Sequence, residues 1–344
     1  MAPSILVALA LGCGPDLSYW RVVQEGEDAG PPPGQDGGTG TIDPPDLGAP
    51  CPNPHVTAVT IAGSSGTARV IRLDPQTGAR CRDADLIAVR EDFGYAIYDV
   101  DWGAGTGTVL GIRDAVLGLG EDGFPAWRAA PPESGFDGRW VVSLGGSQNR
   151  VAAAWSERSS SNLEYLRLFD SGGHSLGEPI ELPFFSAMVS AHPDGSGRLV
   201  WASRRGEIRA VVVSEGIGDI GDEDGEELFA GSADIADDTA LGSRQHLDSD
   251  VTTGRMAMTH DAGVAIWAAG GPAPTTAISC PSLCDGYHVA APDPVSATGA
   301  FVICTRDGDR HLVHAASSGC ERWIDGTSLG SRSLQDVTVV HAAL

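Results

Sequence analysis

The string Leu199-Val-Trp-Ala-Ser-Arg204, an apolar run that ends in charge, recurs in outline at four other places in the chain. Each copy reads as a short apolar strand followed by a polar turn. The third residues of successive copies are 44, 46, 57 and 46 positions apart. The other copies are Val109-Leu-Gly-Ile-Arg-Asp114, Ala153-Ala-Trp-Ser-Glu-Arg158, Met256-Ala-Met-Thr-His-Asp261 and Val302-Ile-Cys-Thr-Arg-Asp307.

Periods of this length, each with room for about four strands, are typical of propeller blades. A further copy at Thr60-Ile-Ala-Gly63 lies 48 residues before Gly111 and brings the number of units to six. Third strands follow the charged turns, as in Thr67–Leu73 and Gly263–Trp267. No long stretch with helical periodicity interrupts them, so the sequence predicts an all-β fold.

First strands precede the repeated string in four units, but not in the first unit. There the sequence reads Ala49-Pro-Cys-Pro-Asn-Pro54, and a run so rich in proline does not fit inside a sheet. At the other end, Asp336-Val-Thr-Val-Val340 reads as a first strand with no unit after it. We therefore expect a β-propeller of six four-stranded blades, closed by the C-terminal strand completing the first blade.

Two stretches resemble known propeller repeats. Ala191-His-Pro-Asp-Gly-Ser-Gly-Arg-Leu-Val-Trp201 is similar to the turn and strand of TolB-like repeats. Val70-Ile-Arg-Leu-Asp-Pro-Gln-Thr-Gly78 is similar to the turn of YVTN and quinoprotein-type repeats. The resemblance implies the propeller fold and no particular activity.

The N-terminal segment has the pattern of an export signal. An apolar run at residues 4–11 is too short to span a bilayer. Leu9-Ala-Leu-Gly-Cys13 resembles the lipobox of bacterial lipoproteins, which implies lipidation at Cys13. Of the 21 residues from Gly30 to Pro50, 12 are Gly or Pro, a composition typical of a disordered tether. We therefore expect a signal peptide at 1–12, a lipidated cysteine and tether at 13–50, and the propeller at 51–344.

The cysteines after Cys13 are even in number, as an oxidising compartment would allow. Our preferred pairing closes three local loops: Cys51 with Cys81, Cys280 with Cys284, and Cys304 with Cys320. Zinc is the alternative, but no Cys-x-x-Cys spacing occurs. The alternative location is the cytosol, which would require reduced cysteines and an uncleaved N-terminus.

The turns between second and third strands would lie together on one face of a propeller. Polar residues there are candidates for binding a partner, although strands commonly end in polar turns. The candidates are Arg113, Asp114, Glu157, Arg158, Arg204, Arg205, His260, Asp261, Arg306 and Asp307. Asp101, Asp194, Asp250 and Asp293 fall near the first-to-second-strand turns of the opposite face, where we expect local turn hydrogen bonds.

Charge and motifs limit the function further. The formal charge of -24 excludes a role that depends on binding nucleic acid. The acidic insertion that contains Asp222 and Asp224 is a weak Ca²⁺ candidate without the full loop spacing, and we expect no other cofactor. Zinc-protease and phosphate-loop motifs are not found in the sequence.

These features predict a monomeric lipoprotein of the bacterial outer membrane, periplasmic or surface-exposed. Its propeller would bind or scaffold another envelope protein or a surface ligand, without catalysis, by analogy with other propellers. The alternative is a propeller enzyme, quinoprotein-like or hydrolytic, with its site at the mouth of the central channel. Channel-facing His, Arg and carboxylate groups with perturbed pKa values would favour that alternative.

Overall fold

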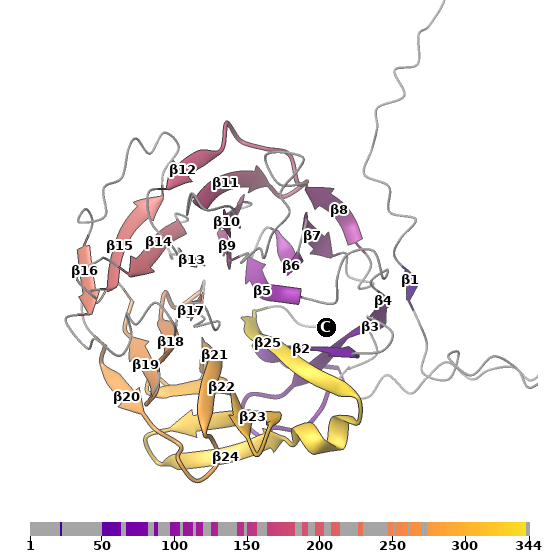
Figure 1. Cartoon of the computed structure of the whole chain (residues 1–344), viewed down its shortest axis with the longest axis vertical. Coiled ribbons are helices and arrows are strands. Elements are labelled where there is room, and N and C mark those ends of the chain that lie inside the picture. The colour runs from indigo at the N-terminus through magenta and orange to yellow at the C-terminus, as the bar shows by residue number, and fades with distance from the viewer. Residues whose placement is uncertain are drawn as a thin grey trace, which may run out of the picture.

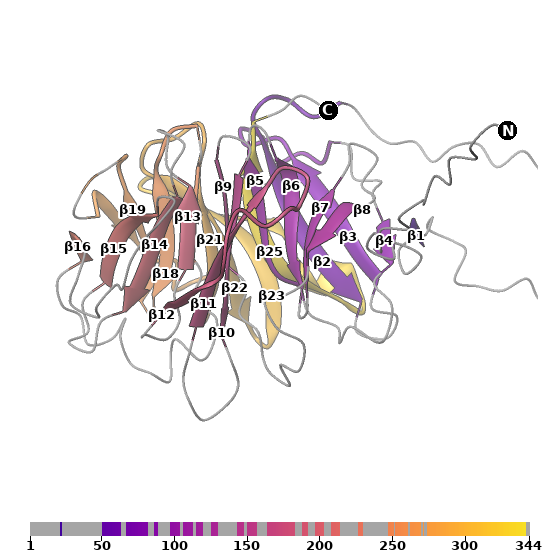
Figure 2. The same ribbon diagram turned by 90° about the horizontal axis from the view of Figure 1, so that it is seen from above.

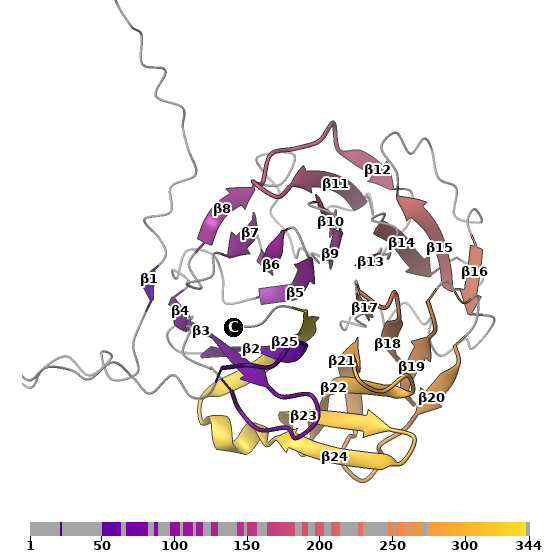
Figure 3. The same ribbon diagram turned by 180° about the vertical axis from the view of Figure 1, so that it is seen from behind.

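Antiparallel sheets stand around a central axis in the computed structural model (Figure 1), and the view from behind shows the same ring (Figure 3). The strands run between the two faces of this ring (Figure 2). The structure describes residues 21–22, 50–62, 67–81, 86–88, 97–103, 106–112, 115–119, 125–129, 143–147, 150–156, 164–182, 188–191, 197–202, 208–213, 226–229, 247–250, 252–260, 262–269, 271 and 274–341.

The described strands form six sheets, and within each sheet every strand is hydrogen-bonded to the one named before it. The first contains β1 (Arg21–Val22), β4 (Leu86–Ala88), β3 (Thr67–Leu73), β2 (His55–Ala62) and β25 (Arg332–Val340). The second contains β5 (Ile97–Gly103), β6 (Gly107–Ile112), β7 (Ala115–Leu119) and β8 (Pro125–Ala129). The third contains β12 (Ile180–Leu182), β11 (Glu164–Asp170), β10 (Arg150–Ser156) and β9 (Ser143–Ser147).

The second half of the chain repeats this meander three times. The fourth sheet contains β13 (Met188–Ala191), β14 (Gly197–Ala202), β15 (Ile208–Val213) and β16 (Glu226–Phe229). The fifth contains β17 (Leu247–Ser249), β18 (Met256–His260), β19 (Gly263–Trp267) and β20 (Thr276–Ile278). The sixth contains β21 (Gly286–Pro292), β22 (Gly299–Arg306), β23 (Asp309–Ala316) and β24 (Gly319–Ile324). A short 3₁₀ helix, η3 (Gly326–Leu329), leads into β25.

The all-β propeller expectation is confirmed by these antiparallel sheets and their radial arrangement. The third strands Thr67–Leu73 and Gly263–Trp267 have the predicted bounds. Residues 50–54 contain no strand, and β25 pairs with β2 from His55↔Val340 to Ala62↔Arg332. In the first sheet β25 therefore occupies the innermost place that β5 and β17 occupy in theirs (Figure 1).

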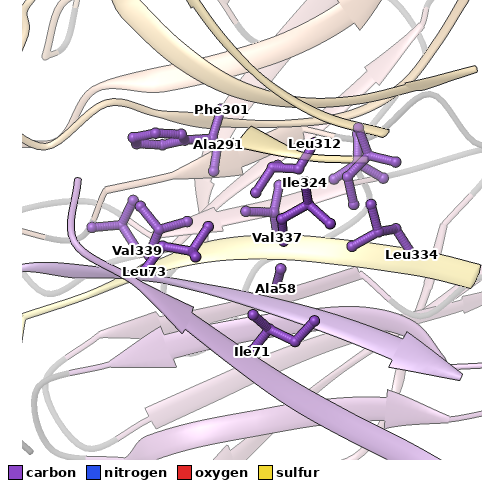
Figure 4. Packing of buried hydrophobic residues seen from close by; sticks show 13 residues of the cluster. Ala58, Ile71, Leu73, Ala291, Phe301, Leu312, Ile324, Leu334, Val337 and Val339 are labelled. Carbon is purple, nitrogen blue, oxygen red and sulfur yellow. The ribbon is translucent and has the colours of Figure 1, made fainter. Parts of the chain in front are cut away.

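The hydrophobic clusters of the described residues lie between neighbouring sheets. Figure 4 shows the cluster where the first sheet meets the sixth, with Val337 and Val339 of β25 beside Phe301 of β22. Similar clusters join the fifth sheet to the sixth and the second to the third. Each fully buried aliphatic or aromatic side chain contributes roughly 1.5–3 kcal/mol, so these contacts hold the sheets in their ring.

Glycine lets one aromatic side chain lie across a sheet. Trp127 on β8 covers Gly118 on β7, where an added Cβ would lie 2.0 Å from the indole Nε1 atom. Gly173, in the turn after β11, meets the same indole ring, with a φ of +79° that favours glycine. Trp127 therefore packs between the second sheet and a turn of the third.

All six cysteines after Cys13 form disulfides, but two of the three predicted pairs are wrong. Cys51–Cys81 is present as predicted, and the others are Cys280–Cys320 and Cys284–Cys304. The predicted Cys304–Cys320 pair fails because Cys304 lies on β22 and Cys320 on β24, and β23 lies between these strands. Cys280 and Cys284 are then free to pair with these two cysteines instead of with each other. Strands two places apart are about 9–10 Å from each other, beyond the reach of a disulfide. The turn at 280–284 instead sends its two cysteines to different strands of the sixth sheet.

Candidate functional site

Four aspartates on three innermost strands are buried near the axis of the ring. Asp99 and Asp101 belong to β5, Asp248 to β17 and Asp336 to β25. Their exposed fractions are 1%, 2%, 4% and 0%. We call these four residues the axial carboxylates. Asp101 was predicted to lie in a turn, and this is wrong: it lies within β5, opposite Val109 of β6.

The local fold explains much of this acidity. An innermost strand has a neighbour on only one side, so its other edge presents backbone N–H groups that need acceptors. Asp101 Oδ1 accepts the N–H of Trp102 at 2.6 Å, and Asp248 Oδ1 accepts that of Ser249 at 2.6 Å. Asp336 Oδ1 does the same for Val337 at 2.7 Å. The same short-range hydrogen bond thus recurs on three strands from three different sheets.

Asp336 also connects two sheets. Its second oxygen, Oδ2, accepts the backbone N–H of Val100 on β5. Both oxygens of this carboxylate therefore receive hydrogen bonds, one from its own strand and one from the neighbouring sheet. This contact ties the C-terminal strand to the second sheet beside the axis.

Asp248 has a different electrostatic environment. Its pKa is raised well above the ordinary value, first by burial and then by the charges of Asp101, Asp336 and Asp99. The hydrogen bond from Ser249 acts in the opposite direction but is weaker. Asp248 Oδ2 is buried and has no hydrogen-bond partner.

A second group lies where the C-terminal segment leaves β25. His341 Nε2 and Asp250 Oδ1 are 2.7 Å apart, and the His341 ring lies 5.9 Å from that of Trp102 between centroids. Burial alone would raise the pKa of Asp250, but hydrogen bonds from His341 and Thr253, together with the charge of His341, hold it below the usual value. His341 therefore links the end of the chain to the fifth sheet and the second.

Two predicted turn aspartates have the expected local role. Asp250 Oδ1 accepts the N–H of Thr252 at 2.9 Å, and Asp293 Oδ1 accepts that of Val295 at 2.7 Å. Arg255 joins these turns, because its guanidinium donates to the carbonyls of Ser296 and Asp293 and lies 3.8 Å from Asp250 Oδ2. Asp194 lies outside the described residues.

Three of the predicted face residues are described. His260 ends β18 and Arg306 ends β22, so they occupy corresponding turns of neighbouring sheets, and Asp307 follows Arg306 with a φ of 54°. Arg306 Nη1 donates to Asp285 Oδ1 at 2.7 Å and to the Pro281 carbonyl at 3.2 Å. Arg306 therefore also fixes the turn that carries the two disulfides of the sixth sheet.

The other predicted site residues fall outside the part of the chain that the structure describes: Cys13, Arg113, Asp114, Glu157, Arg158, Arg204, Arg205, Asp261, Asp222 and Asp224.

Two histidines of β23 serve separate contacts. His311 Nδ1 accepts the N–H of Gly326 at 3.0 Å, whereas His314 Nε2 lies 2.8 Å from Asp293 Oδ2. The His314 ring also packs against Phe301 and Trp323, with centroids 5.0 and 4.9 Å away. Within the described ranges, no three His, Cys, Asp or Glu side chains are placed to hold a metal ion. No described helix is long and apolar enough to cross a membrane.

Comparison with known proteins supports the fold alone. No family model and no curated protein matches the sequence. A protein of unknown function from Bacteroides caccae is similar in structure, with a TM-score of 0.50, 10% identity, and coverage of 85% of this chain and 100% of that one. A chain of the nidogen/laminin complex is similar at a TM-score of 0.51 and 8% identity, covering 83% of this chain and 98% of that one. A putative TolB from Agrobacterium tumefaciens also matches, at a TM-score of 0.41 and 14% identity, covering 85% of this chain and 100% of that one.

Proposed function

We propose that the chain is an exported bacterial lipoprotein, anchored through Cys13, whose propeller binds another envelope protein or a surface ligand. The observation that carries this proposal is the pairing of every cysteine after Cys13 in a disulfide. Disulfides persist in oxidising compartments and are rare in the cytosol. The lipobox-like string that ends at Cys13, followed by a segment rich in Gly and Pro, supports an anchor with a spacer.

We further propose that the six sheets are the full set of blades and that β25 closes the ring. The pairing of β25 with β2 supports closure, because it joins the last described strand to the first long one. A closed ring has no free sheet edge between its ends. Such a domain is held rigidly enough to present its turns as a binding surface.

Binding is favoured over catalysis by the way the polar groups at the axis are used. Asp336 and Asp101 accept backbone N–H groups, Arg255 donates to two carbonyls, and Asp250 pairs with His341. These contacts stabilise the ring itself. The turns that carry His260, Arg306 and Asp307 are the described part of the proposed binding face.

A second candidate function, a propeller enzyme with its site at the channel mouth, is favoured by one observation. The raised pKa of Asp248 is the kind of perturbation that accompanies general acid catalysis. Turnover that is lost in Asp248→Asn while the fold is retained would support the enzyme, whereas binding retained in the same variant would support the module.

The anchor is tested by labelling cells with radioactive palmitate. We expect label in the wild type and none in Cys13→Ala, which should move from the membrane fraction to the soluble fraction. Cys13→Ser is a second variant with the same expected loss. Protease treatment of intact cells then assigns the domain to the surface or the periplasm. An unlabelled wild type would contradict the lipoprotein and favour the cytosolic alternative.

A further inference from the structure

Asp248 differs from the other axial carboxylates in its hydrogen bonding. Both oxygens of Asp336 accept backbone N–H groups. Asp248 Oδ1 accepts one from Ser249, but its Oδ2 is buried without a partner. Among the described carboxylates, no other has a buried oxygen in this state. Leaving a buried charged oxygen without a donor costs more than leaving a neutral group unpaired.

The ionisable side chains that act on Asp248 from the neighbouring strands are acidic. Asp99 and Asp101 on β5 and Asp336 on β25 are the charged groups that act on Asp248. Asp248 is itself the one titratable residue of β17, and β13, which packs beside β17, has none.

The basic groups on the other elements packed near β17 have partners of their own. His260 on β18 accepts the N–H of Ala262 in its own turn, and His288 on β21 contacts the Thr305 hydroxyl. Arg255, in the turn after β17, donates to the carbonyls of Ser296 and Asp293. His341 pairs with Asp250, the acidic residue that follows β17. Among the described residues, therefore, no basic side chain forms a hydrogen bond with Asp248 Oδ2.

A proton on Oδ2 would satisfy this geometry. It would remove the buried charge and turn Oδ2 into an O–H donor, and ionised carboxylates are its natural acceptors because charge-assisted O–H hydrogen bonds are the strong ones. The described side chains offer no three-ligand metal arrangement that could take the place of the proton.

We propose that Asp248 carries a proton on Oδ2 at neutral pH and donates it to a carboxylate oxygen of Asp101 or Asp336. This hydrogen bond joins the innermost strand of the fifth sheet to that of the second or the first, beside the axis. The proton comes from solvent when the chain folds and returns to solvent at high pH. The ring is then a pH-responsive element, tightened by acid and loosened by alkali.

The linkage has a definite sign. The pKa of Asp248 is higher in the folded chain than in the unfolded one, so the folded state binds more protons. The stabilisation is complete below the unfolded pKa of about 3.9 and is lost as the pH rises through the folded value. One proton changes the folding equilibrium by about tenfold per pH unit in that window.

The matched variant is Asp248→Asn, which keeps the shape, the acceptor for Ser249 and a donor in place of the proton. We expect the folding equilibrium of the wild type to weaken relative to this variant, by up to tenfold per unit, as the pH rises above about 4. The control is Asp307→Asn, whose side chain is 87% exposed. Its pH profile should run parallel to that of the wild type, because both share the surface-charge contribution.

Infrared difference spectroscopy gives a second readout that does not depend on stability. We expect the carbonyl band of a protonated carboxylic acid in the wild type at pH 7, its loss in Asp248→Asn and its retention in Asp307→Asn. Parallel pH profiles of the wild type and Asp248→Asn, or no band in the wild type, would overturn the proposal. Stabilisation by Ca²⁺ that Asp248→Asn abolishes would overturn it in favour of a metal. If Asp248→Asn does not fold, the wild-type spectrum decides alone.

Discussion

Val337 lies on the C-terminal strand β25, which pairs with β2 in the first sheet, and Val337→Ala tests how much that strand stabilises the fold. The side chain is fully buried, with an exposed fraction of 0%, in the cluster shared by the first and sixth sheets (Figure 4). The change removes two methyl groups. At about 0.8 kcal/mol each, their transfer accounts for about 1.6 kcal/mol, and an incompletely closed cavity raises the expected loss to about 2–3 kcal/mol.

The assay is equilibrium urea denaturation followed by tryptophan fluorescence. The control is Val295→Ala, because Val295 is 52% exposed in the turn between β21 and β22. Surface changes of this kind fall within about 0.5 kcal/mol of the wild type. A Val337→Ala midpoint equal to that of Val295→Ala would refute the packing of β25 against β2 and β22. A midpoint lowered without a change in slope would support it.

Two further predictions concern packing and acid stability. Gly118→Ala should destabilise the fold by about 1–3 kcal/mol, because the new Cβ would meet the Trp127 indole at 2.0 Å, whereas an added Cβ at Gly286 meets no atom within 4 Å. Calorimetry that finds equal melting temperatures for Gly118→Ala and Gly286→Ala would contradict this contact. The pKa of Asp250 is lower in the folded chain than in the unfolded one. Ionised Asp250 therefore stabilises the fold above about pH 4, and this stabilisation is lost as the pH falls through the pKa of the folded chain. Asp250→Asn should therefore flatten the stability profile in acid, and unchanged acid unfolding curves would exclude the pairing with His341.

The sequence predicts the strands of this fold where apolar residues run together. The second and third strands of each unit have such runs, and their spacing identifies the propeller. The strand β17 was missed, because Leu247 is its sole apolar residue. Its short span is held by pairing with β18, which sequence periodicity does not show. Asp248, whose pKa is raised well above its ordinary value, lies in this strand.

The axial carboxylates could not be recognised from sequence for a related reason. Asp101, Asp248 and Asp336 are far apart along the chain, and they meet only because three innermost strands converge near the axis. Asp101 reads as a turn residue because glycines follow it, yet β5 continues to Gly103. The predicted first strands carry only part of this signal, an aspartate in two of them, Asp99 and Asp336. Asp101 lies just beyond a predicted strand, and Asp248 lies in one that was not predicted.

The disulfide pairing was predicted by the wrong criterion. Loop closure favours cysteines that are close in sequence, and this choice is correct for Cys51–Cys81. In the sixth sheet the order of the strands decides the pairing instead. The turn before β21 is linked through Cys280 to Cys320 of β24 and through Cys284 to Cys304 of β22. Only the arrangement of the strands in space shows that Cys280 and Cys284, four residues apart, pair with cysteines on different strands.

The most direct test of the exported, disulfide-linked propeller is a disulfide map of the protein isolated from its native cells. Free thiols are blocked by alkylation at lysis, and the peptides are then separated and identified by mass spectrometry without reduction. We expect three linked peptides, Cys51–Cys81, Cys280–Cys320 and Cys284–Cys304. Alkylated cysteines at these positions would contradict the oxidising compartment, and a Cys304–Cys320 link would contradict the arrangement of the sixth sheet.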